Sequence, residues 1–557
     1  MSSIVDEITQ TRNGVDAVKI HNCESVPLHR EQAVAILLFV FSLAYLCIFR
    51  LHCSFEADEG IVLQGAERIL RGEVPYRDFF TFYTPGSFYL VAFVLKLFGD
   101  TLIAARISLA VSGAACAIIT FLLARRVCSL GVALFAGVLA TVAGSAYRFL
   151  VLHNWYSTFL CGVGLYSAVR FYETRRRFWA FAMGFAAALT FLVEQSKGAG
   201  IFLGILLAWI ILRSSQRIPS LGRGSIEAAL AGFLLPILST FGYFAVRHSL
   251  KIMLQSWAWP LRHYTAANHV PYGWQNWSQD SVDTIFHTGP LWIRTLKVLA
   301  VSPGILVPAL PLIALGVLVY WTLRMRASTI SMEQAGYYVI VCCVSDGLLV
   351  SVVAARADVI HFMYLTPLWY VVLAWMIEQS KHSLTWNALR PYFISYVVLA
   401  FGLLGTALLL NATGARIQLH TRRGVITSAA QDPALDYLQS HTVPAQQVLV
   451  YPYLPLYNYL TATRSPSRYD YFQPGLNTPE QSRQIIASLQ SQHSDGVLFE
   501  PWFSEKIANS WPGTPLPAIA QDSVSDYIAR TYRICKILNS SGGGQFEYMV
   551  QRGAVCR

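Results

Sequence analysis

Three acidic residues, Glu56, Asp58 and Glu59, lie close together directly after an apolar segment that is long enough to cross a membrane. Carboxylates at a membrane–water boundary are costly unless they are solvated or used, so their position indicates a functional site. A carboxylate at this depth can act as a general base that takes a proton from an acceptor hydroxyl or amine. The alternative is that these are solvated loop acids that keep this side of the membrane free of positive charge.

The composition shows that a membrane-embedded scaffold must position these acids. Hydrophobic residues make up 54% of the 557 residues and charged residues only 13%, and the mean hydropathy is +0.45. A chain so poor in charge could not cover its own surface in water, which excludes a soluble multidomain protein. The net charge of +11 does not indicate nucleic-acid binding, because Lys and Arg gather on the cytoplasmic loops of membrane proteins.

The apolar blocks predict a mainly α, polytopic transmembrane bundle of about eleven spans. They lie at 33–50, 103–124, 130–147, 154–171, 178–193, 198–213, 226–247, 297–322, 335–354, 359–379 and 391–411. A shorter block at 84–98 contains Pro85 and predicts an interfacial or re-entrant helix. With that block uncounted and the N-terminus inside, the strongly basic short loops, such as Arg125-Arg126, all fall on the inner side.

This topology divides the chain into three parts. Residues 1–32 form a cytoplasmic tail, residues 33–411 a transmembrane domain with the acidic outer loop 51–102, and residues 412–557 an outer domain. The last part has no spanning block, but short apolar runs at 448–451 and 496–499 predict strands, and 479–490 predicts a helix. About 145 residues are enough for a small α/β domain with its own core.

The acidic loop and its surroundings resemble the GT-C class of integral-membrane glycosyltransferases, over roughly residues 30–410. More narrowly they are similar to the bacterial protein-mannosyltransferase-like family, and more distantly to the lipid A aminoarabinose transferases. The features that carry the resemblance are the pair Asp58-Glu59 after the first span, an amphipathic stretch, the proline-containing segment 84–98, Leu97-Phe98-Gly99-Asp100 and Ala104-Ala105-Arg106. The resemblance implies transfer of a sugar from a polyprenyl-phosphate carrier at the outer leaflet to an acceptor, commonly with inversion.

The resemblance also implies roles for individual residues. Asp58 matches the catalytic Asp, and Glu59 matches its partner, which would orient the acceptor. Lys197, in Glu194-Gln195-Ser196-Lys197-Gly198, resembles a Lys that lies near the donor phosphate; it could instead be a snorkelling Lys at a helix end. Arg356 and His361 resemble a basic turn that clamps phosphate. The alternative for Arg356 is that it only neutralises Asp358 at an interface.

Four further residues are candidate acceptor or sugar contacts: Asp78, Tyr83, His153 and Asn154. Two of them mark departures from relatives. Several relatives carry an acid near Asn154, which cannot act as a base, and the aminoarabinose transferases have Glu-Lys where this chain has Tyr83-Thr84. Both departures argue against aminoarabinose as the donor sugar.

The predicted outer segment 248–296 is rich in aromatic and histidine residues. They are Trp257, Trp259, His263, Tyr264, His269, Tyr272, Trp274 and Trp277. Such side chains could stack on sugar rings, and an interfacial aromatic belt explains them equally well.

The cysteines and histidines predict a disulfide and no metal site. Cys535 and Cys556 lie in the predicted outer domain, where oxidation is permitted, and are candidates for a disulfide. The histidines are scattered without ligand spacing. Adjacent carboxylates such as Asp58 and Glu59 can attract a divalent cation near a phosphate, but the similar families do not generally depend on one. We therefore expect no metal and no other cofactor.

The sequence thus predicts an inverting glycosyltransferase of the bacterial plasma membrane that acts on a polyprenyl-phosphate-linked sugar and a glycan, lipid or protein acceptor. The first alternative is a transporter or flippase of a lipid-linked or small substrate. A transporter needs charges within its spans, and Asp346 is the main example here. The second alternative is a non-catalytic scaffold, against which the pair Asp58-Glu59 argues.

Overall fold

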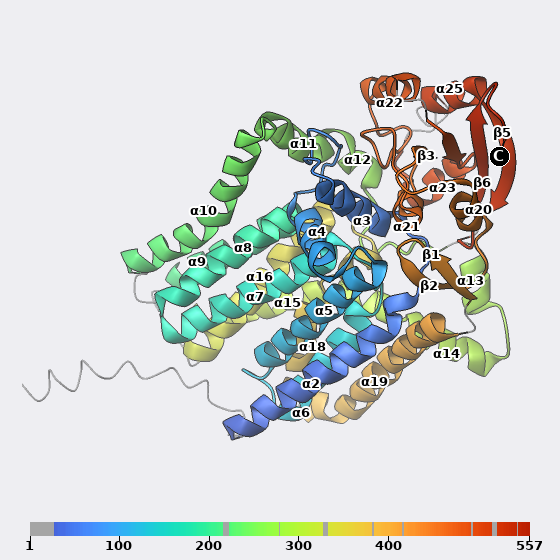
Figure 1. Cartoon of the computed structure of the whole chain (residues 1–557). Coiled ribbons are helices and arrows are strands. Elements are labelled where there is room, and N and C mark those ends of the chain that lie inside the picture. Colours follow the sequence, from blue (N-terminus) through green and yellow to red (C-terminus); the bar gives the residue numbers. More distant parts are fainter. Residues whose placement is uncertain are drawn as a thin grey trace, which may run out of the picture.

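The computed structural model describes most of the chain (Figure 1). The described residues are 27–214, 222–277, 279–326, 332–380, 384–414, 417–491, 494–514, 521–542 and 544–556. Most of the predicted cytoplasmic tail, residues 1–26, therefore lies outside the described residues.

Helices dominate the part of the chain before residue 414, as the hydropathy pattern predicts. They are α2 (Leu28–Ile48), η1 (Phe49–Leu51), α3 (Ala57–Leu70), α4 (Gly86–Phe98), α5 (Leu102–Ala124), α6 (Leu130–Leu139), η2 (Ala140–Ser145), α7 (His153–Thr174), α8 (Arg177–Val193), α9 (Gln195–Ser214), α10 (Arg223–Val246), α11 (Leu250–His263), α12 (Thr265–Asn268), α13 (Gln279–Phe286), α14 (Leu291–Val301), α15 (Pro303–Arg326), α16 (Met332–Ala355), α17 (Val359–Met363), α18 (Thr366–Gln379) and α19 (Leu384–Thr413). The mainly α fold is confirmed.

Seven helical segments among the described residues are long and apolar enough to cross a membrane. They coincide with seven of the eleven predicted spans. The other four predicted spans are also helical but differ in detail: α6 with η2, and α8, are shorter apolar helices, α7 is less apolar, and 359–379 is divided into α17 and α18. The segment 84–98 forms the 13-residue helix α4, about 20 Å long, which is too short to span the hydrocarbon core.

The bundle is held together by close helix contacts as well as by apolar side chains. Helices α9 and α16 approach so closely at Gly200 and Gly347 that a Cβ on Gly200 would lie 2.6 Å from the carbonyl oxygen of Gly347. Small residues are typical of such helix crossings in membranes. The hydrophobic effect does little to drive helices together in lipid, so helix association depends on the close packing that small residues allow. The α9–α16 contact joins the N-terminal part of α9 to the C-terminal part of α16.

The C-terminal region has the mixed α/β content that its sequence predicts. A hairpin of β1 (Ile417–Thr421) and β2 (Gly424–Ser428) precedes a four-stranded sheet in the order β3-β4-β6-β5. Strands β3 (Val448–Tyr451) and β4 (Gly496–Phe499) are parallel, whereas β6 (Gln545–Gln551) is antiparallel to both β4 and β5 (Tyr532–Asn539). The predicted helix at 479–490 is α22 (Pro479–Ser491). The remaining helices are α20 (Pro433–His441), α21 (Leu456–Thr461), α23 (Phe503–Ser510) and α25 (Ser523–Thr531).

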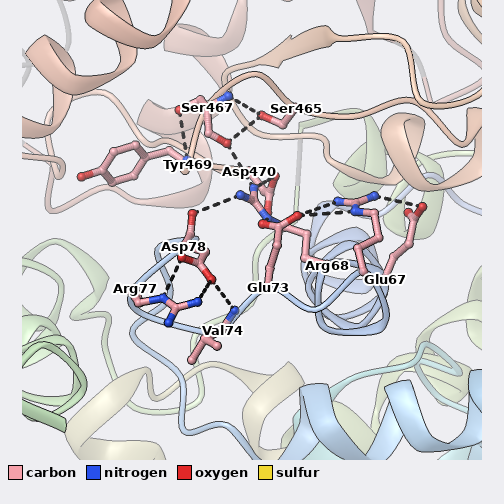
Figure 2. A network of polar contacts seen from close by, with 11 residues as sticks. Glu67, Arg68, Glu73, Val74, Arg77, Asp78, Ser465, Ser467, Tyr469 and Asp470 are labelled. Atoms are coloured by element: carbon pink, nitrogen blue, oxygen red, sulfur yellow. Dashed lines mark hydrogen bonds and ion pairs between the residues drawn. The ribbon is translucent and has the colours of Figure 1, made fainter. Parts of the chain in front are cut away.

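This region lies against one end of the bundle, beside α3 and α12 (Figure 1). Gly60 of α3 packs on the backbone of Leu456 at the start of α21, and a Cβ at Gly60 would lie 2.3 Å from the Leu456 nitrogen. Figure 2 shows a polar network at the other end of α3, in which Arg68 reaches Asp470 of the C-terminal region. The C-terminal region is thus attached directly to the helix that begins with the acidic motif.

Candidate active site

Asp58 lies in the first turn of α3, and Glu56 occupies the position before that helix. Both carboxylates pair with the same guanidinium: Nη2 of Arg148 lies 2.7 Å from Oε2 of Glu56 and 3.2 Å from Oδ2 of Asp58. The Asp58 side chain is 37% exposed, so one face of this carboxylate remains open. An ionised acid at the start of a helix is also favoured by the helix dipole.

Arg148 and Tyr364 connect the acids to the rest of the bundle. Arg148 follows the π-helical turn η2 that ends the α6 segment, and its Nη1 donates to the Tyr364 hydroxyl at 3.1 Å. The Tyr364 ring lies edge-on to Trp155 at 5.1 Å between centroids. Nζ of Lys197 lies 5.6 Å from the Tyr364 ring centroid. Tyr364 therefore contacts Arg148 through its hydroxyl and Lys197 through its ring.

The structure gives Glu59 a different place from the one predicted. Its side chain is 1% exposed and accepts two hydrogen bonds from the fully buried Arg106, at 2.9 and 2.6 Å. A third bond comes from the backbone nitrogen of Val151 at 3.0 Å. A carboxylate enclosed in this way cannot orient an acceptor. Its role is to fix α3 to α5, and the acid that lies beside Asp58 is Glu56.

Lys197 is buried, and protein groups occupy its ammonium. Nζ donates to the carbonyl oxygen of Asn154 at 2.8 Å and to the Ser157 and Thr158 hydroxyls at 3.1 Å, and it pairs with Glu194 at 3.1 Å. A buried Lys held by several oxygens is not a snorkelling residue. Its three protons are already used, so direct contact with a donor phosphate requires a change of partners.

The guanidinium of Arg356 is also occupied by protein groups, one of which is its neighbour Asp358. Its guanidinium contacts Asp358 at 2.5 Å, Asn268 at 3.0 Å and the Ser510 carbonyl at 2.6 Å. Its pair with Asp358 is the alternative given for it above, and its bonds to Asn268 and Ser510 join α12 to the C-terminal region as well. Burial alone raises the pKa of the Asp358 carboxyl, but His361 and Arg356 outweigh burial and lower it to about 2.

His361 is the more open member of this basic turn. Its Nδ1 lies 2.6 Å from the Asp358 carboxylate, which also accepts from the His361 backbone and caps α17. The His361 side chain is 30% exposed, and its ring lies edge-on to Tyr364 at 6.0 Å. A histidine whose Nδ1 is bonded to a carboxylate is oriented to use its other nitrogen.

The four candidate substrate contacts lie in two places. The Tyr83 ring packs on His153 at 4.5 Å, and the charge of Asp58 acts on both side chains, so they belong to the site. Asn154 contributes its backbone carbonyl to Lys197. Asp78 instead lies in the network of Figure 2, bonded to Arg77 and to the Val74 nitrogen. The bond from Arg77 lowers the pKa of Asp78.

Several residues of this site were not identified from the sequence. Glu56 was noted only as part of an acidic cluster, and Tyr364 lies within a predicted span. Arg148 did carry a signal, because it is an arginine predicted to lie on the outer side, where the positive-inside rule disfavours one. Two tyrosines from distant segments are influenced by Asp58: burial and, after it, the charge of Asp58 raise the pKa of Tyr264 to about 12 and that of Tyr453 well above its usual range.

No group of three or more His, Cys, Asp or Glu side chains that could hold a metal ion occurs among the residues that the structure describes. In that same part of the chain, Asp58 and Glu56 share the charge of Arg148, and Glu59 is paired with Arg106. The expectation of a metal-free site stays a prediction.

Comparisons with known proteins show what part of the chain and its fold are similar to. Residues 83–244 match the family model described as dolichyl-phosphate-mannose-protein mannosyltransferase; no curated protein matches the chain. The fold is similar to apo ArnT from Cupriavidus metallidurans, with a TM-score of 0.51, 13% identity and coverage of 94% of this chain and 97% of that one. The oligosaccharyltransferase of Archaeoglobus fulgidus, tethered with an acceptor peptide, aligns with a TM-score of 0.49, 10% identity and coverage of 94% and 74%. As its sequence predicts, the chain is a multi-pass membrane protein, and its fold is similar to that of apo ArnT.

Proposed function

We propose that this protein transfers a sugar from a polyprenyl-phosphate carrier to an acceptor at the outer face of a membrane, with inversion, and that Asp58 is the general base. The observation that carries the proposal is the carboxylate of Asp58, which is 37% exposed and is held by Arg148 at 3.2 Å. The matched family model names a lipid-phosphate sugar donor, which agrees with this chemistry.

Asp58 removes the proton from the acceptor hydroxyl or amine as that atom attacks the anomeric carbon. The bond between this carbon and the phosphate oxygen breaks, and the oxygen leaves with the bonding electrons. Attack from the side opposite the phosphate inverts the anomeric configuration. The ion pair with Arg148 positions Asp58, and a base positioned within hydrogen-bond reach contributes typically about 10²- to 10⁴-fold to the rate.

The leaving phosphate needs positive charge and hydrogen-bond donors, and exposure separates the candidate groups. Arg148 and His361 are 20% and 30% exposed, whereas Lys197 and Arg356 are 3% and 8% exposed. Arg148 and His361 therefore make the first contacts with the phosphate. Lys197 acts behind Tyr364, where its charge is effective across a short distance because little water screens it.

The bacterial plasma membrane, with the C-terminal region outside, is the proposed location. Two observations support this orientation. The basic loops fall on the opposite side, and Cys535 and Cys556 of the C-terminal region form a disulfide, which persists in oxidising compartments. The acceptor is a glycan, lipid or protein that reaches this face, and no metal takes part.

The test is turnover by the purified, full-length protein in liposomes that contain polyprenyl-phosphate-linked hexoses and pentoses and a membrane extract as acceptor. Asp58→Asn is expected to lower transfer by about 10²-fold or more, because the amide cannot accept the proton. The matched control is Asp280→Asn, on α13. Transfer at a normal rate by Asp58→Asn would remove Asp58 as the base.

One observation keeps the transporter alternative open to test. Both carboxylate oxygens of Asp346, in α16, are buried without a hydrogen-bond partner among the described residues, and charged groups inside spans often serve transport. The same liposomes distinguish the two functions. A glycosyltransferase releases the sugar from its carrier without net movement of the carrier across the bilayer. A flippase moves the carrier across the bilayer and leaves the sugar attached.

A further inference from the structure

Helix α10 ends at a corner where the chain turns into α11, at the end of the bundle that also carries the C-terminal region (Figure 1). No Asp or Glu occurs at positions 228–279, which include most of α10 and all of α11 and α12. The corner and α11 nevertheless carry Arg247, Lys251 and Arg262, and all three are exposed. The positive-inside rule disfavours Lys and Arg on the predicted outer side, so this surface requires an explanation.

Arg247, the residue that follows α10, has no acidic partner in the part of the chain that the structure describes. Its guanidinium lies over the Tyr243 ring, 5.6 Å from the centroid, and donates no hydrogen bond to a described residue. Lys251 likewise has no partner among those residues. The dipole of α10 favours a cation at this helix end. The five N–H donors of Arg247 are therefore available to a ligand, in the fixed fork that suits a phosphate.

Two phenols from different helices meet beside Arg247. The Tyr89 hydroxyl of α4 donates to the Tyr243 hydroxyl of α10 at 3.0 Å, so the Tyr243 hydrogen is left for another acceptor. Tyr243 is 39% exposed. Arg77 lies near enough to interact electrostatically with the same hydroxyl, although its guanidinium already bonds to Asp78. The corner thus presents a guanidinium and a hydroxyl donor in neighbouring positions.

The corner is fixed by a small core of its own. Phe244 of α10 and Met253 of α11 both belong to this core. The Tyr76 ring meets Phe244 edge-on, with centroids 5.4 Å apart, and the Tyr76 hydroxyl accepts from Nε1 of Trp257 at 2.9 Å. Because both helices are packed on the same core, the donors of the corner are held in position before a ligand arrives. Preorganisation of this kind lowers the entropy cost of binding.

Exposed apolar side chains lie on the two helices that meet at the phenol pair. They are Leu235, Leu238 and Val246 of α10, and Phe93 and Leu97 of α4. Both helices pack on α8, and α10 is long and apolar enough to cross a membrane. Such side chains face acyl chains in a bilayer, and the end of a span lies at the level of the headgroups. The donors of the corner therefore lie at the depth of lipid phosphates.

We propose that the α10–α11 corner is a binding site for the phosphate of an anionic phospholipid headgroup, to which Arg247 and the Tyr243 hydroxyl donate. Lys251 adds positive charge four positions further on. A zwitterionic headgroup carries its own cation, which this acid-free surface repels, and the apolar side chains beside the donors favour a lipid over a soluble acidic ligand. The inference goes beyond the proposed function, because this lipid is neither the sugar carrier nor the acceptor.

The experiment labels the corner with photoactivatable lipids. The purified full-length protein in detergent is titrated with phosphatidylglycerol or phosphatidylcholine that carries the same photoactivatable group next to the headgroup, and peptide mass spectrometry measures labelling of residues 223–264. The variants are Arg247→Gln, Lys251→Gln and Tyr243→Phe, which keeps the ring. The matched control is Arg483→Gln, at a side chain of the C-terminal region that is 75% exposed. No sugar donor is present, so the result is independent of transfer.

The unaltered protein is expected to be half-labelled by phosphatidylglycerol at a concentration at least about fivefold below that of phosphatidylcholine. Arg247→Gln and Lys251→Gln should each raise the phosphatidylglycerol concentration about fivefold, the effect of one cation near a charged headgroup. Tyr243→Phe should raise it by a similar factor, because one hydrogen bond is lost. Equal labelling by the two lipids, or labelling of Arg247→Gln that matches the control, overturns the proposal.

Two competitors distinguish the possible sources of the phosphate. Unlabelled phosphatidylglycerol should suppress labelling more effectively than undecaprenyl phosphate or inorganic phosphate. Stronger competition by undecaprenyl phosphate would assign the corner to the sugar carrier. Competition by inorganic phosphate as effective as that by phosphatidylglycerol would assign it to a free anion. Either result overturns the assignment to a phospholipid.

Discussion

The two ends of helix α3 carry ionic clusters of opposite character. At its N-terminal end, Asp58 and the guanidinium of Arg148 form an ion pair whose side chains are 37% and 20% exposed. At its C-terminal end, Arg68 and Asp470 are 7% and 5% exposed, and their atoms lie 2.9 Å apart. The first pair can exchange partners with a ligand at little cost, whereas the second cannot open without exposing buried charge.

The buried cluster explains how the open one is held in place. Arg68 bonds to Asp470, to Glu73 and to the Ser467 carbonyl (Figure 2), and Arg423 of the C-terminal region pairs with Glu67. These contacts join α3 to a region about 400 positions away in the sequence. A rigid helix anchored at its far end presents Asp58 in a fixed position, which is what a general base requires.

The largest effect on stability is expected from breaking the most buried pair. Glu59→Ala leaves the guanidinium of Arg106, which has no exposed surface, without its counter-charge, and removal of one partner of a buried pair costs about 3–5 kcal/mol. Thermal unfolding in detergent should show a large loss for Glu59→Ala. Asp58→Asn, its neighbour on the open side, should unfold as the unaltered protein does. Equal stabilities for the two variants would contradict the distinction between a buried Glu59 and a partly exposed Asp58.

A somewhat smaller effect is expected at the attachment of the C-terminal region. Arg68→Met retains the apolar stem but removes the charge that pairs with Asp470, for a loss of up to about 3 kcal/mol. Because α3 then loses its anchor, transfer should also slow, with a fall in kcat. The control is Arg223→Met, in a pair whose side chains are 94% and 62% exposed. An Arg68 variant that keeps normal kcat would show that anchoring does not position Asp58.

The pH dependence of stability should have opposite signs at two buried acids. The pKa of Asp358 is lowered to about 2, since His361 and Arg356 outweigh burial, so its contribution is complete above pH 4 and is lost as the pH falls to 2. That contribution is about 2 kcal/mol. Burial raises the pKa of Asp470, so its contribution is complete at low pH and is lost as the pH rises through the raised value.

Melting temperatures of the unaltered protein and Asp358→Asn, compared between pH 7 and pH 2, test this expectation. The variant should be less stable at pH 7, and the difference should vanish near pH 2. A difference that stays constant over this range would mean that the Asp358 charge does not stabilise the fold. The melting temperature of Asp470→Asn, relative to that of the unaltered protein, should be highest at pH 7, where the Asp470 charge destabilises the fold most.

The sequence predicted the parts of this comparison that depend on local pattern. The helices follow from apolar blocks, and the strands β3 and β4 follow from short apolar runs between turns. The place of the acidic cluster beside a span drew attention to it, and the resemblance to GT-C glycosyltransferases then singled out Asp58. Local pattern could not show that Asp58 is partly exposed and Glu59 buried. Glu59 is buried because it pairs with Arg106, which lies 47 positions further along the chain.

The pairings missed by the sequence analysis are long-range and specific. Whether Lys197 and Arg356 are free cations depends on acceptors such as Asn154 and Ser510, which belong to other elements. The Arg68–Asp470 pair spans 402 positions. No periodicity or residue type predicts such partners, because they are set by the way the C-terminal region packs on the bundle. Only Arg148, an arginine on the predicted outer side, carried a local signal.

The smallest effect, and the sharpest test of an open cluster, is expected from Glu56→Gln. Glu56 is 40% exposed and shares Arg148 with Asp58, so its loss should change stability by less than about 1 kcal/mol, as for exposed pairs in general. Without the Glu56 charge, Arg148 pairs with Asp58 alone. The stronger pair holds the proposed base more tightly, so kcat should fall a few-fold. Transfer is measured in the liposome assay and stability by thermal unfolding, in both cases beside the control Glu227→Gln, from the exposed pair with Arg223. A stability loss as large as that of Glu59→Ala would show that the N-terminal end of α3 is closed as well.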